Sequence, residues 1–286
     1  LDAVIDPRTG ATVCRSTLTN PTDGCIPYNI FGTNVNGPTE WRYLAPYPGY
    51  AITILSQDVV QGSMTGEPFS TWAGPVSLAF GAEHRVEKVR GLASADDVAR
   101  RFFAGNYIAT NAQWHVTEGF VETVVPLAKD EAWADSLELN AAVRGAQYSE
   151  SGFNLTWKAG VIYRPSDEVT LRVTQSRDIR APNLGDLFNQ GRAGTGNVND
   201  PFRGNESVTI VSADVGNPNL QPEKADTTGL GLVYSPTWLD GFTASFDYYQ
   251  IHIKDAITIL DNQRVLNRCF AGVTALCSSI TRGAPA

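Results

Sequence analysis

The sequence predicts an all-β fold, built as an antiparallel meander of long strands. Eight segments alternate apolar and polar residues with a period of two, as strands with two different faces do. The segments are 13 to 16 residues long, whereas strands of soluble sheets usually have about five or six. The connections between them alternate between short turns and long loops.

The strands are expected, in chain order, at residues 52–64, 75–88, 111–126, 135–148, 152–164, 167–179, 221–236 and 241–256. In the fifth strand, Phe153, Leu155 and Trp157 share one face, and the polar residues between them share the other. No segment has a convincing helical period, although 94–105 is compatible with a short helix. Without helices to cover them, the apolar faces need a second sheet, a solenoid or lipid.

The connections fall into two groups by length. Four short ones, most of which contain Pro or Gly, join alternate pairs of strands at 65–74, 127–134, 165–166 and 237–240. The other end of the sheet carries longer loops, chiefly 89–110 and 180–220, with 149–151 as the one short exception. Outer-membrane barrels have this asymmetry, with tight periplasmic turns and long external loops. The sequence therefore predicts the strands of an outer-membrane β-barrel.

This topology divides the chain along its length. Residues 1–51 and 257–286 are expected on the external loop side, 52–179 as six strands, 180–220 as a long external loop, and 221–256 as two strands. The long loop is rich in glycine, and its pattern buries little, so we expect it to be the most mobile element.

The polar faces of the strands are expected to line the lumen, among them Lys158, Arg164 and Arg172. The apolar residues of strand 167–179 would face lipid. Towards its end this strand leaves the apolar zone, so the charges of the stretch SRDIR would be solvated at the external rim. Pro182 then ends the ladder, because proline lacks a backbone donor.

Composition narrows the function classes. The 286 residues carry a net charge of −8, which argues against a nucleic-acid partner. No run of 18 apolar residues occurs, so no transmembrane helix is predicted. The start, LDAVIDPRTG, has no signal-peptide pattern, and the polar end is abrupt. We interpret the sequence as a piece of a longer protein.

The four cysteines form two local pairs, Cys14 with Cys25 and Cys269 with Cys277. Neither pair has a C-x-x-C spacing or a nearby histidine, which disfavours zinc. Two disulfides in an oxidising compartment are expected, and four free thiols in a cytosolic protein are the alternative. Both pairs fall on the loop end of the sheet, so we expect them outside the membrane.

No catalytic constellation is present. The three histidines lie in no metal-binding spacing, and no G-x-S-x-G motif occurs. The glycine-rich stretch 191–196 lacks the lysine of a phosphate loop and is expected to be a flexible loop. Glu118 and Glu122 lie about 13 Å apart on one strand face, too far for a glycosidase pair. The sequence predicts no enzyme, no cofactor and no metal.

Two groups of residues are candidates for ligand binding. The aromatic stretch WRYLAPYPGY contains Trp41, Tyr43, Tyr47 and Tyr50, which could stack on a ligand or simply pack in a girdle or loop. In the long loop, Arg192 and Arg203 could attract an anionic chelate, although solvated loop charges are the commoner case.

Several stretches occur together in a fixed order: CIPYNIFG (25–32), GPVSLAFGAEHRVE (74–87), EGFVETVVPL (118–127), LELNAAVRGAQYSESG (137–152), TWKAGVIYRP (156–165), SRDIRAPNLGDLF (176–188), VGNPNLQPEKADTTGLGLVYSP (215–236) and FDYYQIHIKDAI (246–257). In these stretches the sequence resembles the TonB-dependent outer-membrane receptors of Gram-negative bacteria. The resemblance implies a closed barrel of about twenty-two strands with a plugged lumen. This chain would supply about eight strands, and no stretch matches the plug or the TonB-contacting segment.

The resemblance also implies a function. Such a receptor would import a scarce small-molecule ligand, such as siderophore-bound iron, a vitamin or an oligosaccharide. Import would be ligand-gated, in contact with outer-membrane lipid, and energised by the TonB complex through the missing N-terminal part. The alternatives are a passive porin-like or structural barrel and, less favoured, a secreted β-rich carbohydrate-binding domain.

Overall fold

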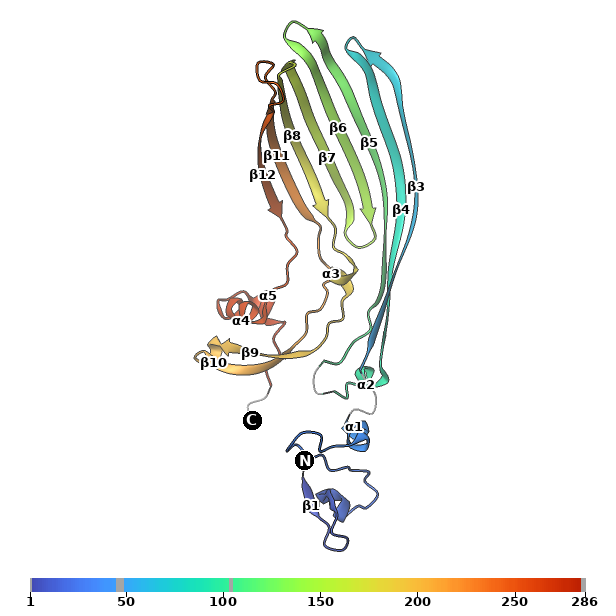
Figure 1. Ribbon diagram of the computed structural model, residues 1–286, viewed down its shortest axis with the longest axis vertical. Coiled ribbons are helices and arrows are strands. Elements are labelled where there is room, and N and C mark those ends of the chain that lie inside the picture. Colours follow the sequence, from blue (N-terminus) through green and yellow to red (C-terminus); the bar gives the residue numbers. More distant parts are fainter. Residues whose placement is uncertain (1, 45–48, 103–104, 284–286) are drawn as a thin grey trace. The chain divides into compact units, whose positions relative to one another are not determined.

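The computed structural model describes residues 2–44, 49–102 and 105–283 (Figure 1). The chain divides into two compact units, Leu1–Ala51 with Ala93–Tyr107 and Ile52–Leu92 with Ile108–Ala286. Within the described residues, no helix has the length and apolar character needed to cross a membrane.

The smaller unit consists of short elements. They are the paired strands β1 (Ala3–Ile5) and β2 (Thr12–Cys14), the 3-10 helix η1 (Arg15–Leu18), and the helices α1 (Pro38–Leu44) and α2 (Ala95–Val98). A disulfide joins Cys14 to Cys25, as predicted. The helix expected within 94–105 is present but ends after a single turn.

A buried carboxylate, Asp97, organises the end of this unit. It accepts hydrogen bonds from the Ser94 hydroxyl (2.5 Å) and from the backbone N–H groups of Tyr107 (3.0 Å) and Tyr50 (3.1 Å). The Ser94 hydrogen bond is the main cause that holds the pKa of Asp97 below its usual range. Since Ser94 also caps α2, this one helical turn ties together the chain segments on either side of it.

The larger unit is built on an eight-stranded antiparallel sheet in the order β12-β11-β8-β7-β6-β5-β4-β3. The strands are β3 (Ala51–Thr71), β4 (Gly74–Ala93), β5 (Asn111–Glu131), β6 (Ala134–Tyr148), β7 (Gly152–Ser166), β8 (Val169–Arg180), β11 (Glu223–Tyr234) and β12 (Ala244–Lys254). Strands that neighbour one another in sequence therefore pair, except where β9 (Gly194–Asp200) and β10 (Glu206–Ser212) form a hairpin of their own between β8 and β11. The predicted meander is confirmed.

The first strands are longer than the sequence pattern predicted. β3 has 21 residues, because the stretch 65–71, which we had assigned to a turn, continues the strand up to Thr71. Pro68 lies within this extension. Proline is tolerated there because β3 forms one edge of the sheet, where one row of backbone donors has no partner strand among the described residues.

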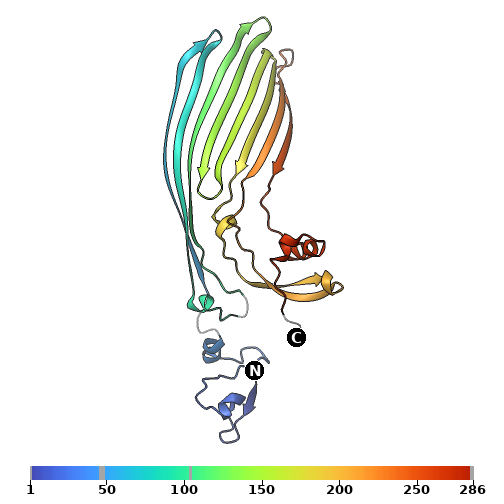
Figure 2. The same cartoon turned by 180° about the vertical axis from the view of Figure 1, so that it is seen from behind.

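The connections are sorted as expected (Figures 1 and 2). At the upper end of the sheet in both views, short turns join consecutive strands at 72–73, 132–133, 167–168 and 235–243. The other end carries 94–110 and 181–222, with the tight turn 149–151 between β6 and β7.

The strand register gives the sheet two distinct faces. In one cross-strand row, Val121 lies opposite Val143, which lies opposite Trp157; in the adjacent row, Glu122, Ala142 and Lys158 are aligned in the same way. We call the first face the apolar face and the second the polar face. The apolar face leaves large side chains exposed, among them Phe80, Val121, Val143, Leu171, Val173, Leu230, Leu232 and Phe246. Leu139, Trp157 and Leu171 lie on this face, as their shared parity predicted.

Candidate functional site

The loop between β8 and β11 is folded rather than irregular. It contains α3 (Leu184–Phe188), β9, the 3-10 helix η2 (Pro201–Arg203) and β10. The expectation that this loop buries little is wrong, because Leu184, Leu187 and Val198 are buried. The stretch 191–196, expected to be a flexible loop, runs into β9 from Gly194 onward.

Helix α3 begins at a reciprocal cap directly after Pro182. The Asn183 side chain accepts from the Asp186 backbone N–H (2.8 Å), and the Asp186 carboxylate accepts from the Asn183 N–H (3.0 Å). Such a box satisfies two N–H groups that would otherwise have no partner. The pattern N-x-x-D after a proline is a sequence signal for this helix, whereas the proline alone predicts only the end of a strand.

The α3 helix folds back onto the polar face of the sheet. Leu184 joins a cluster with Trp114 and Val116 of β5 and with Val89 and Ala146 of the neighbouring strands. The loop thus contributes to the core, and α3 covers part of the polar face.

The end of the loop that leads to β11 is hydrogen-bonded to α3 and to the residue after it. Gly216 donates to the Asn189 carbonyl (2.7 Å), and Asn217 donates to the Asp186 carbonyl (2.8 Å). A side chain at Gly216 would place its Cβ 2.5 Å from the carbonyl carbon of Leu187, so only glycine permits this close approach.

Two arginines of the SRDIR stretch are paired rather than simply solvated, which corrects our expectation. Arg177 donates to both carboxylate oxygens of Asp226 (2.7 and 3.0 Å). Arg180 donates to both oxygens of Glu223 (2.9 and 3.0 Å) and to Asp186 (3.0 Å). These bidentate pairs fasten β8 to β11 from opposite faces, and they connect the end of the strand to α3.

A second set of contacts connects the long loop to the C-terminal segment. Arg282 donates to both carboxylate oxygens of the buried Asp200 (2.7 and 3.1 Å) and lies 4.6 Å above the Phe202 ring. The Phe202 ring packs edge-on against Phe270 at 4.9 Å. The hydrogen bond from Arg282 is the main cause that lowers the pKa of Asp200.

The C-terminal segment contains helices α4 (Asn262–Phe270) and α5 (Thr274–Cys277), joined by the predicted Cys269–Cys277 disulfide. Gln263 of α4 also donates to the Asn199 carbonyl of β9 (2.8 Å). We call residues 181–222 together with 255–283 the loop assembly. A groove of about 1640 Å³ runs between its two parts, and its lining includes Arg203, Asp200 and Arg282.

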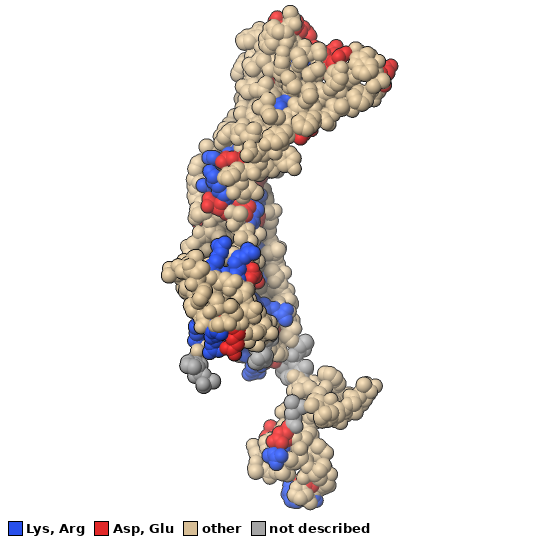
Figure 3. Space-filling view, turned by 90° about the vertical axis from the view of Figure 1, so that its left-hand side faces the viewer, with Lys and Arg blue, Asp and Glu red and all other residues tan. Residues whose placement is uncertain are grey.

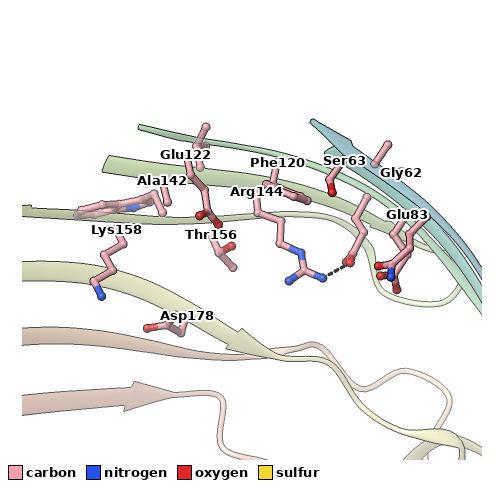
Figure 4. A pocket seen from close by; sticks show the side chains of 15 residues that line it. Gly62, Ser63, Glu83, Phe120, Glu122, Ala142, Arg144, Thr156, Lys158 and Asp178 are labelled. Atoms are coloured by element: carbon pink, nitrogen blue, oxygen red, sulfur yellow. Dashed lines mark hydrogen bonds and ion pairs between the residues drawn. The ribbon is translucent and has the colours of Figure 1, made fainter. Parts of the chain in front are cut away.

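The polar face holds a second recess, of about 500 Å³ (Figure 4). Its charged lining is Glu83, Glu118, Glu122, Arg144, Lys158 and Asp178. Arg144 donates to the buried Glu118, whose other carboxylate oxygen has no partner among the described residues. Glu122 and Lys158 line the same recess from β5 and β7. Charged groups spread along a wall in this way suit contact with a polar solute rather than bond chemistry.

The structure separates the predicted site residues into three places. Lys158, Arg164 and Arg172 lie on the polar face, where Arg172 donates to Asp247 (2.9 Å). Arg192 is an exposed residue of the long loop, and Arg203 lines its groove.

The aromatic candidates belong to the smaller unit. Trp41 and Tyr43 are exposed on α1, and the Trp41 ring packs edge-on against Tyr28 at 5.8 Å. Tyr47 lies outside the described residues. No group of three potential metal-binding His, Cys, Asp or Glu side chains occurs within 2–44, 49–102 and 105–283.

Comparison with known proteins agrees with this architecture. Residues 18–282 match the family model for the TonB-dependent receptor-like β-barrel. No curated protein matches the chain.

Solved receptors share the fold. The ferric enterobactin receptor PfeA of Pseudomonas aeruginosa is 18% identical, with a TM-score of 0.51 over 71% of this chain and 27% of that one. The siderophore receptor PirA of Acinetobacter baumannii is 17% identical, with a TM-score of 0.53 over 71% of this chain and 28% of that one. PirA of P. aeruginosa has the same identity and TM-score and is covered over 33% of its length.

The chain therefore spans about a third or less of these receptors. At such low identity the likeness establishes the fold alone, whereas the family match covers nearly the whole sequence. The chain belongs to the TonB-dependent receptor family, and its long antiparallel sheet is part of that family's β-barrel.

Proposed function

We propose that this chain is part of an outer-membrane receptor that imports a ferric siderophore, gated by ligand and energised through the TonB complex. The family match over residues 18–282 carries the proposal. Similar structures named as enterobactin and siderophore receptors favour this ligand class over a vitamin or an oligosaccharide.

In the proposed orientation the apolar face meets lipid and the polar face lines the lumen. The exposed apolar side chains of one face favour this choice, because a barrel wall presents such a band to the membrane. The short turns would then lie in the periplasm. The loop assembly and both disulfides would lie outside, where oxidation is possible.

Ligand capture is assigned to the loop assembly. Its groove is large enough for a chelate, and Arg203 and the exposed Arg192 would attract an anionic one. Trp41 and Tyr43 belong to the smaller unit, and we propose them separately as exposed aromatic stacking surfaces. From the groove the ligand would move along the polar face of the sheet, past Lys158, Arg164 and Arg172.

The test is iron uptake by cells that express the full-length receptor, in the presence and absence of a functional TonB complex. Radioactive ferric enterobactin is the probe. Saturable uptake that disappears without TonB is expected. Uptake that continues unchanged without TonB would contradict the proposal and favour a passive barrel.

A second measurement tests the capture site itself. Deleting residues 190–210 in the full-length receptor should weaken binding of ferric enterobactin and leave barrel assembly intact. The charge-conserving Arg203→Lys variant is the matched control for Arg203→Ala. Unchanged affinity after the deletion would remove the loop assembly from the site and leave recognition to the lumen.

A further inference from the structure

The apolar face changes character towards the loop end of β8, β11 and β12. The register aligns Val173, Leu230 and Tyr248 in one cross-strand row. The next row on this face consists of Gln175, Thr228 and Gln250, and the following one of Arg177, Asp226 and His252. Three adjacent strands therefore pass together from apolar to hydrogen-bonding to charged side chains.

The last row on this face brings two lysines together. Lys224 and Lys254 lie directly opposite each other on paired strands, and both are exposed. Like charges in directly opposed positions destabilise a sheet. Neither lysine forms a salt bridge within the described part of the chain, so this arrangement has a cost that an anion between them would remove.

The neighbouring charges offset this pair only in part, because the Asp226 carboxylate that attracts Lys254 is also bound by Arg177. Asp226 is the one acidic residue of these rows in β8, β11 and β12, and Arg177 already holds both of its oxygens. His252 adjoins the lysines on the same face and carries a ring N–H that can donate to an anion. The cluster of Lys224, Lys254 and His252 thus keeps an excess of positive charge next to the apolar band.

A side view shows the same division. Figure 3 shows an upper part of the sheet with few charged residues, and below it a band where Lys and Arg gather together with acids. On β4 and β5 the apolar face ends in a similar way, since His84, Arg90 and His115 follow Phe80 and Val121 on that face. Positive groups therefore border the apolar band at two separate places.

We propose that Lys224 and Lys254, with His252, bind the phosphate group of an anionic membrane lipid at the external rim of the barrel. Phosphate oxygens suit two ammonium groups and an imidazole N–H, and an acyl chain would continue over Tyr248 and Leu230. The position beside the apolar band favours a lipid over a free anion. This inference rests on the proposed contact between the apolar face and lipid.

The test uses the full-length receptor and lipid retention measured by native mass spectrometry. The probes are phosphatidylglycerol, which is anionic, and phosphatidylcholine, which has no net charge. The receptor should retain phosphatidylglycerol preferentially. Each of Lys224→Ser and Lys254→Ser should reduce that retention about fivefold, and the double variant about 25-fold. Lys158→Ser makes the same change on the polar face and should leave retention unchanged.

The melting temperature, measured with and without phosphatidylglycerol, is a second readout in case a variant assembles poorly. In uncharged detergent, Lys254→Ser should raise the melting temperature, because it removes the like-charge contact. With phosphatidylglycerol the same variant should lie below the unmodified receptor. The charge-conserving Lys224→Arg/Lys254→Arg variant should keep the lipid response. Equal retention by the receptor and the Ser double variant, or full stabilisation by inorganic phosphate alone, would overturn the proposal.

Failure of this inference is distinguishable from failure of the proposed function. Lipid retention is measured without siderophore, and uptake through TonB is measured without adding lipid. TonB-dependent uptake together with unselective lipid retention would reject the lipid site alone.

Discussion

In the sheet, neighbouring strands are joined by backbone ladders over most of their length, whereas the loop assembly is held in place by a small number of separate contacts. The pairing of β6 with β7 runs without interruption from Ser136 to Tyr148. The loop assembly depends instead on the Asp200–Arg282 ion pair, the Phe202–Phe270 contact and the packing of Leu184 against the sheet. A sheet with many backbone hydrogen bonds tolerates the loss of one of them. A loop held by a few contacts loses much of its stability when one contact is removed. We therefore expect single substitutions to open the loop assembly without unfolding the sheet.

The largest effect is expected from Leu184→Ala. Removing this buried side chain should cost about 2 to 4 kcal/mol, because it leaves a cavity between α3 and β5. Hydrogen exchange in the full-length receptor should show lost protection in residues 184–217 and unchanged protection in β6 and β7. Equal loss in both regions would mean that the two regions unfold as one unit.

The second effect concerns the Cys269–Cys277 disulfide. Replacing both cysteines with serine should loosen α4 and α5 by about 2.5 kcal/mol, from the entropy of the short loop that the bond closes. Exchange should then rise in 262–283 and in β9, which α4 contacts. The matched control replaces Cys14 and Cys25, and it should leave the loop assembly as it was.

A smaller effect is expected at the cap of α3. Asn183→Ala should cost about 1 kcal/mol, because the Asp186 N–H loses its acceptor. Asn183→Asp keeps a side-chain acceptor and should be nearly neutral. The readout is hydrogen exchange at 184–189, and equal protection in the two variants would show that the cap contributes nothing.

These contacts also explain which features of the fold could be predicted from the sequence and which could not. The alternation of apolar and polar residues is a local pattern, so the strands and their faces could be predicted. The two disulfides could be predicted because the cysteines of each pair are close in sequence. The Asp200–Arg282 pair joins residues 82 positions apart, and no local signal connects them. The cap at Asn183 has a local signal, the N-x-x-D pattern, but the proline before it also predicts the end of a strand. The extension of β3 was missed because its Gly and Pro residues resemble a turn.

The smallest expected effect is that of pH on the stability of the Asp200–Arg282 ion pair. The lowered pKa of Asp200 means that its contribution is present above the ordinary value of about 4 and is lost as the pH falls through the lower, folded-state pKa. Spin labels on Thr209 and Val273 should therefore keep their separation between about pH 5 and pH 8 and move apart only in stronger acid. A change in their separation near neutral pH would mean that another group controls this contact.

The two faces of the sheet are the central claim, and adjacent positions on one strand test it most directly. Spin labels are attached in the full-length receptor, in a lipid bilayer, through Leu171→Cys on the apolar face or Arg172→Cys on the polar face. The label at 171 should be accessible to oxygen and shielded from a polar nickel reagent, and the label at 172 should show the opposite. Equal accessibility at both positions, or the reverse order, would contradict the assignment of lipid and lumen.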